Sequence, residues 1–154
     1  MYRLLFVIAA LALFSACAQG ASSPEPPEIR YGEDICDGCS MIISDARFAE
    51  AYAHEVSPER YESKAFDDIG GMLLHAQKHA DDAVAEWYVH DYGSEEWVDA
   101  KQATFVMSDD LHTPMGYGII AYADATAAES TAAEVNGMVM TWDELRAAEI
   151  AHGH

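Results

Sequence analysis

Basic residues are scarce in this sequence. It contains 8 Lys and Arg against 27 Asp and Glu, which gives a formal net charge of −19 at pH 7. Proteins that follow nucleic-acid phosphates need clustered Lys and Arg, so no nucleic-acid partner is expected. The acidity favours solubility and attracts cations loosely, but by itself it indicates no specific site.

Cysteine is also rare, and several catalytic motifs are missing. The 3 cysteines are Cys17, Cys36 and Cys39. The sequence has no CxxCH for attached haem, no G-x-S-x-G turn and no Gly-rich phosphate loop. It therefore shows no hydrolase or nucleotide site, and we predict that the protein is not an enzyme.

Long apolar runs are absent as well. The run from Leu4 to Phe14 follows a single positive charge and ends in Ser15-Ala16, directly before Cys17. This pattern is typical of a secretory signal over residues 1–16, and it is too short for a permanent membrane-spanning helix. A cysteine in this place resembles a bacterial lipobox, so Cys17 is the predicted lipidation site. The alternative is an ordinary cleaved signal with Cys17 left free.

The rest of the chain divides by composition. Residues 17–34 are rich in Pro, Ser and Glu without an apolar period, which predicts a disordered tether. The remainder is predicted to be α+β, with two small similar modules over residues 35–84 and 85–151. Each module is expected to contain a strand hairpin or meander followed by a helix.

Turn and capping signals place the elements. Strands are predicted over residues 61–66, 87–89, 97–98, 104–107, 117–122 and 138–140, whereas 48–54 reads as either a strand or a short helix. Asp67 is expected to cap a helix that ends near Ala80, and further helices are predicted over 124–135 and from Thr141 to about 151. Gly70-Gly71 in the first helical turn costs roughly 1 kcal/mol each relative to Ala, which indicates a close approach to the backbone there.

Two strand-to-helix junctions resemble each other. Residues 65–69 and 141–145 both carry an aromatic residue, an acid pair and an aliphatic residue, at an offset of 76 residues. Cys39 and Met115 have the same offset. The comparison suggests an internal repeat in which these two residues hold corresponding places.

The stretch Cys36-Asp37-Gly38-Cys39-Ser40-Met41 places three sulfur-bearing side chains close together, just before Ile42-Ile43. If residues 39–43 are extended, Cys39 and Met41 point to the same face, roughly 6–7 Å apart. A thiolate and a thioether are soft donors that favour Cu(I), whereas zinc sites seldom use Met. The alternative, that Met41 fills the core and Cys36–Cys39 form a structural disulfide, stays open on these residues alone.

A second informative stretch is Thr113-Pro114-Met115-Gly116-Tyr117-Gly118. Pro fixes the turn and the two Gly residues allow close packing, so Met115 is expected on a stiff loop. A thioether held there suits a metal ligand, although core or loop packing is the alternative.

Histidines supply reserve ligands. His90 and His112 are candidates, and His112 lies closer in sequence to Met115. His75 and His79 are spaced so that they could share a metal, but no third ligand lies beside them, which favours an exposed helix face. The CxxC also raises thioredoxin-like redox chemistry, but that chemistry needs a helix after the second Cys, whereas 41–43 reads as a strand.

Several motifs together resemble the NosL family, the accessory lipoproteins of nitrous oxide reductase. They are the lipobox cysteine and, in order, the stretches at 36–45, 66–72, 87–91, 97–100 and 113–118. The resemblance covers about residues 36–145. Ser40 stands where the family commonly has Gly.

The resemblance implies a periplasmic metallochaperone of two similar α+β modules that binds Cu(I), anchored through Cys17, with the outer membrane as the expected location. Cys39 and Met41 would be copper ligands, with Met115 as the third and Met72 and Cys36 in reserve. The expected partners are an ABC-type copper and sulfur maturation complex and nitrous oxide reductase, whose copper–sulfide centre would be served. A periplasmic thiol–disulfide oxidoreductase, or a chaperone for a different cuproenzyme, is the alternative.

Overall fold

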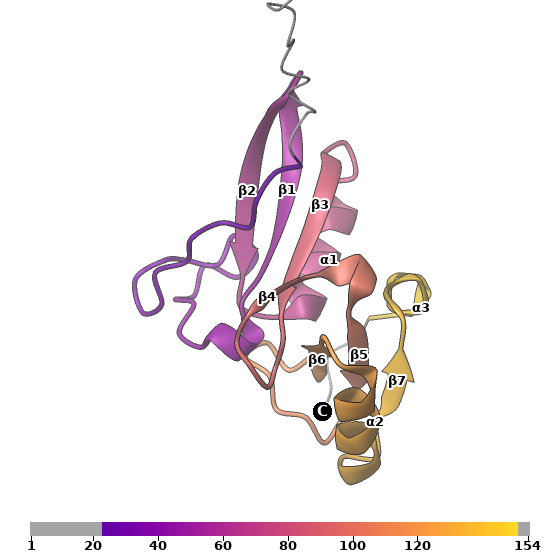
Figure 1. Cartoon of the computed structure of the whole chain (residues 1–154). Helices are drawn as coiled ribbons and strands as arrows, with labels where there is room; N and C mark the ends of the chain where they lie inside the picture. Colours follow the sequence, from indigo (N-terminus) through magenta and orange to yellow (C-terminus); the bar gives the residue numbers. More distant parts are fainter. Residues whose placement is uncertain (1–22, 151–154) are drawn as a thin grey trace, which may run out of the picture.

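The computed structural model describes residues 23–150, which form two antiparallel sheets with helices packed beside them (Figure 1). The first sheet has the order β2-β1-β3-β4 and the second the order β6-β5-β7. The strands are β1 (Glu50–Ser57), β2 (Arg60–Phe66), β3 (Ala83–His90), β4 (Trp97–Asp99), β5 (Thr104–Met107), β6 (Ile119–Tyr122) and β7 (Met138–Met140). The helices are α1 (Ile69–Lys78), α2 (Ala125–Glu134) and α3 (Trp142–Ala147), and 3-10 turns occupy Ala46–Phe48 and Ala100–Gln102. The predicted α+β class is confirmed.

Both sheets are built along the same path through the chain. In each, two strands form a hairpin, a helix follows, and a third strand returns to the other side of the first, so that β1 and β5 are central. Asp68 caps α1 and Asp124 caps α2. The predicted offset of 76 residues is therefore wrong, because Thr141 opens α3, which has no counterpart in the first unit. The acid pairs of the two junctions also hold different places, because Asp68 is the N-cap of α1 whereas Asp143 and Glu144 lie in the first turn of α3.

The first unit extends further along the chain than its predicted end at residue 84. β3 begins at Ala83 and β4 ends at Asp99, and both pair within the first sheet. The main core then joins the two units. It contains Phe66 and Ile69 from the first, together with residues of the second such as Phe105, Ile119, Trp142 and Leu145.

The fold also begins earlier than the predicted tether boundary. Ile29 belongs to the main core, and the Gly32 N–H donates to the Ile43 carbonyl at 2.8 Å. The Tyr88 hydroxyl donates to the Pro24 carbonyl across the first sheet. Residues 24–34 therefore contact the folded part of the chain, and the predicted disordered tether is wrong for this segment. Its composition does not reveal that Ile29 and the backbone groups have partners elsewhere in the chain.

Several predictions fall outside residues 23–150. These are the signal over residues 1–16, the lipidation site Cys17 and the start of the tether. Within the described range, no helix is both long enough and apolar enough to cross a membrane.

Helix α1 is pinned to the second unit at its first turn. Asp68 accepts the Gly70 N–H at 3.0 Å, and Ile69, Met72 and Leu73 are buried. A Cβ added at Gly70 would lie 2.5 Å from Tyr117 Cβ and closer still to its ring. The close approach predicted from Gly70-Gly71 is therefore real at Gly70, and it fixes the loop before β6 against the start of α1.

Candidate metal centre

Residues 36–41 form a tight loop and not the start of a strand. The Ser40 N–H donates to the Cys36 carbonyl at 2.9 Å, and the Cys36 N–H donates to the Met41 carbonyl at 2.8 Å. Ser40 has a positive φ of 64°, a conformation that favours glycine. The prediction of an extended stretch from Cys39 is therefore wrong, because only Ile42 pairs, in an isolated bridge with Ile35.

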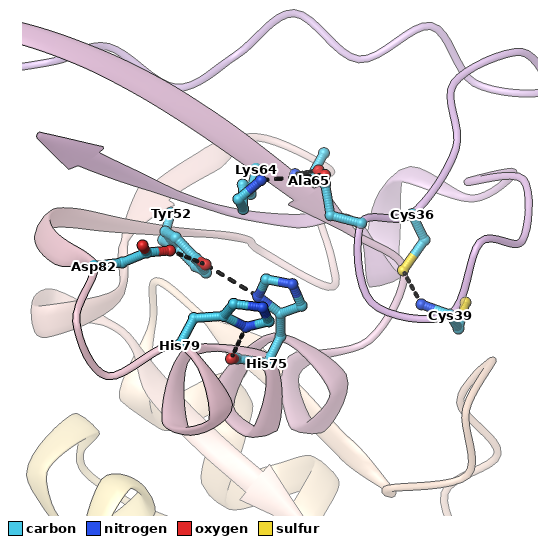
Figure 2. Close-up of polar contacts among 9 residues, drawn as sticks. Cys36, Cys39, Tyr52, Lys64, Ala65, His75, His79 and Asp82 are labelled. Atoms are coloured by element: carbon cyan, nitrogen blue, oxygen red, sulfur yellow. Dashed lines mark hydrogen bonds and ion pairs between the residues drawn. The ribbon is translucent and has the colours of Figure 1, made fainter. Parts of the chain in front are cut away.

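The two cysteines of the loop have different environments, and both are free thiols. Cys36 is buried, and its Sγ accepts the Cys39 N–H at 3.4 Å (Figure 2). Burial raises the pKa of the Cys36 thiol to about 12, so this thiol keeps its proton at neutral pH. Cys39 is half-buried, and its Sγ accepts the Met41 N–H at 3.4 Å. Cys39 is therefore the more accessible sulfur.

Asp67 completes a cluster that sequence reasoning missed. The Cys39 thiol donates to its carboxylate, with 3.5 Å to Oδ1 and 3.6 Å to Oδ2. Ligand atoms of Cys36, Cys39 and Asp67 lie within 4.8 Å of one another, and no other such group of three occurs in the described part of the chain. Asp67 is the cap that the sequence predicts for α1, but Asp68 caps the helix. The acid pair was a signal in the sequence that one of the two carboxylates has another role, since a helix needs only one N-cap.

Asp68 ties the Met115 loop to this cluster. Its Oδ2 accepts the Thr113 hydroxyl at 2.5 Å and the Met115 N–H at 3.1 Å. Burial raises the pKa of Asp68, while the hydrogen bonds from Thr113 and Met115 oppose that rise. Because Asp67 and Asp68 are adjacent, the Cys39 thiol and the Met115 backbone are held by neighbouring carboxylates. Cys39 and Met115 also pack against the same core.

Glu50 is a second acid near this network. It is fully buried, and within residues 23–150 its Oε2 has no hydrogen-bond partner. Burial, and then the negative charge of Asp68, raise the pKa of Glu50 well above its usual range. A neutral Glu50 lets two acids share the core without direct charge repulsion.

The other predicted metal ligands differ in how far they are exposed to solvent. Met41 follows the loop with its side chain 59% exposed, whereas Met72 is fully buried on α1. His90 is buried, and both ring nitrogens have partners: Nδ1 with the Ala49 carbonyl at 2.5 Å and Nε2 with the Tyr31 hydroxyl at 3.2 Å. His112 is exposed on the loop before Met115. Neither histidine joins Cys36, Cys39 and Asp67 in the three-residue group.

The arrangement offers soft ligands at one edge of the fold. Cys39 supplies a thiol that becomes a thiolate on metal binding, and Met41 follows two residues later with an exposed thioether. The Met115 amide donates to Asp68, the residue that follows Asp67 in the chain. Such a set suits a soft monovalent ion better than a hard cation.

Comparisons with known proteins give one fold match and one family match. The chain is similar in fold to the crystal structure of the copper chaperone NosL from Shewanella denitrificans, with a TM-score of 0.65 and 20% sequence identity. That comparison covers 79% of this chain and 96% of the other. No curated protein matches the chain. The sequence model of the NosL family matches residues 29–150. This chain therefore belongs to the NosL family.

Proposed function

We propose that this chain is a metallochaperone that carries Cu(I) on sulfur ligands and passes it to another protein, without catalysing a reaction. The observation that carries the proposal is the position of Cys39. Its thiol is half-buried against Asp67, two residues before the exposed Met41, and the next acid in the chain, Asp68, holds the Met115 amide. One thiolate with thioethers would hold Cu(I) and still release it, because a neutral thioether adds no charge to the bond.

Asp67 has a supporting part in this proposal. Its carboxylate is a hard donor and therefore a poor ligand for Cu(I). Its hydrogen bond with the Cys39 thiol instead fixes the direction of that sulfur. Cys36, buried beneath the loop, accepts the Cys39 N–H and supports the loop from inside.

The surface around the loop suits transfer to a client. Ile35 is 60% exposed and Ile42 54%, and the two pair across an isolated bridge beside Met41. Exposed apolar side chains gathered at a site are typical of a protein-docking surface. A client can therefore approach the copper without the chaperone unfolding.

Membership of the NosL family supports a role in copper handling, since the solved relative is described as a copper chaperone. The client that we propose is nitrous oxide reductase, reached through an ABC-type copper and sulfur maturation complex. The docking surface would decide between this client and another cuproenzyme.

Replacing Met115 with alanine is expected to weaken Cu(I) binding at least tenfold, or about 1.4 kcal/mol, with the fold intact. The loop is held by the backbone and Thr113 contacts to Asp68, which the substitution leaves in place. Competition titration with a Cu(I) chelator measures the affinity, and thermal melts of the apo protein report the fold.

Met72→Ala is the matched control. Met72 is fully buried, so its truncation should destabilise the protein by about 2–5 kcal/mol and leave the Cu(I) affinity near that of the wild type. Unchanged affinity in Met115→Ala together with a clear loss in Met72→Ala would assign the third ligand to Met72.

We further propose that the protein is a lipoprotein that faces the periplasm from the outer membrane. Cys17→Ser should move it from the membrane fraction to the soluble periplasm, because the acyl chains would be lost. Fractionation followed by immunoblotting checks this, with Cys36→Ser as a control that keeps the lipobox. A Cys17→Ser variant that still pellets with membranes would rule out anchoring through acylation.

A further inference from the structure

A pair of histidines at the end of α1 forms a second cluster, separate from the cysteine loop. His75 and His79 stack with ring centroids 4.1 Å apart and an interplanar angle of 19°. Figure 2 shows the two rings lying together, with the Tyr52 hydroxyl pointing toward them. His75 is half-buried and His79 is exposed, so solvent reaches the pair.

One nitrogen of His79 is already oriented by the backbone. Its Nδ1 lies 2.9 Å from the His75 carbonyl, within the same helix turn (Figure 2). A carbonyl only accepts hydrogen bonds, so Nδ1 carries the proton. The lone pair of this imidazole is therefore on Nε2.

His75 is oriented by a side-chain relay. The Tyr52 hydroxyl lies 3.0 Å from His75 Nδ1 and donates to Asp82 Oδ2 at 3.5 Å. In the tautomer that leaves the phenol proton directed to Asp82, the Nδ1–H of His75 donates to the phenol oxygen, and His75 Nε2 carries a lone pair. This is the outer-shell pattern by which proteins fix the tautomer of metal-binding histidines.

The environment of His75 suits a metal ligand. Burial, and then the neighbouring His79, lower the pKa of His75, and Lys64 adds to this effect while Asp37 and Asp82 oppose it. A neutral imidazole is the form that binds metals. The pair also lies at the C-terminal end of α1, where the helix dipole favours positive charge.

We propose that Nε2 of His75 and Nε2 of His79 together bind a divalent late transition-metal ion such as Zn(II), with water completing the coordination. Two histidines four apart on a helix lie on one face, and imidazole suits Zn, Cu and Ni in the divalent state. The site differs from the sulfur cluster in ligand chemistry and does not depend on copper being carried there.

The test is a titration of the full chain with Zn(II), followed in long-range ¹H–¹⁵N spectra of the histidine rings. These spectra separate imidazole binding from any Zn(II) held by the cysteines. The Nε2 signals of His75 and His79 should shift along one common saturation curve. In His79→Ala, saturation at His75 should require at least about tenfold more Zn(II), because the chelate is lost.

Two further variants sharpen the result. Tyr52→Phe keeps both imidazoles and the buried ring but removes the relay, so the affinity should fall by about tenfold or more. His152→Ala combined with His154→Ala removes two histidines that are no part of the proposed site and should leave the curve unchanged. Unmoved Nε2 signals of His75 and His79 at saturating Zn(II), or wild-type affinity in His79→Ala, would overturn the proposal.

Discussion

Replacing Cys39 with serine is expected to lower the Cu(I) affinity at least a hundredfold, which corresponds to about 2.7 kcal/mol. Cys39 supplies the only charged soft donor of the proposed ligand set, and a serine hydroxyl is a hard donor that stays protonated. The side chain is half-buried and only partly packed, so the fold should survive. Competition titration with a Cu(I) chelator gives the affinity, and circular dichroism of the apo protein confirms the fold.

Cys36→Ser is the matched control for this experiment. Its sulfur is buried and its thiol keeps the proton, so the variant should lose stability but bind Cu(I) within about tenfold of the wild type. An equal loss of affinity in both variants would show that Cys36 and Cys39 both bind Cu(I) as thiolates, which contradicts the proposed site with one thiolate.

The same pair of variants tests the redox alternative. A CxxC oxidoreductase needs both cysteines, and its reactive thiol usually lies at the N-terminus of a helix that lowers its pKa. Here Cys39 is followed by Ser40 with positive φ and then by Ile42 in a bridge to Ile35. The loop therefore supports a carrier, and disulfide reduction that vanishes in Cys36→Ser would instead support the enzyme.

Much of the fold was predictable because the local signals agree with the tertiary structure. The strands predicted at 61–66 and 104–107 are found as β2 and β5, and the helix predicted over 124–135 is found as α2. Position 48–54 was ambiguous between a strand and a short helix. Residues 50–57 form strand β1 because they pair with β2 and β3. The sequence of the segment alone does not show this pairing.

The candidate site was only partly predictable. Cys39, which groups with Cys36 and Asp67, was singled out from its residue type, whereas Met115 stays a predicted ligand. The shape of the cysteine loop could not be predicted, because Ser40 adopts a conformation that sequence patterns assign to glycine. Asp67 was assigned to the helix cap, since nothing local shows which acid of a pair faces the cysteines. The role of Asp68 depends on the Thr113–Tyr117 loop, which is brought to it only by tertiary packing.

The contact between α1 and the Thr113–Tyr117 loop predicts a second large effect, which is a loss of stability. Gly70→Ala is expected to destabilise the protein by about 3 kcal/mol, because the new Cβ would lie 2.5 Å from Tyr117 Cβ and 2.8 Å from Cδ1. Neither the helix backbone nor the packed Tyr117 can move without disturbing the Asp68 hydrogen bonds. The free energy of unfolding in urea measures the loss.

Gly71→Ala separates this clash from helix propensity. A Cβ at Gly71 would meet its nearest neighbours, Asp68 and Tyr117, only at 3.9 Å, an ordinary contact distance. Alanine there should therefore leave the stability unchanged or raise it by up to about 1 kcal/mol. Because Tyr117 lies two residues after Met115, Gly70→Ala should also weaken Cu(I) binding, whereas Gly71→Ala should not. Equal stability of the two variants would show that α1 and the Met115 loop are not locked together, and the proposed link between helix and copper site would fail with it.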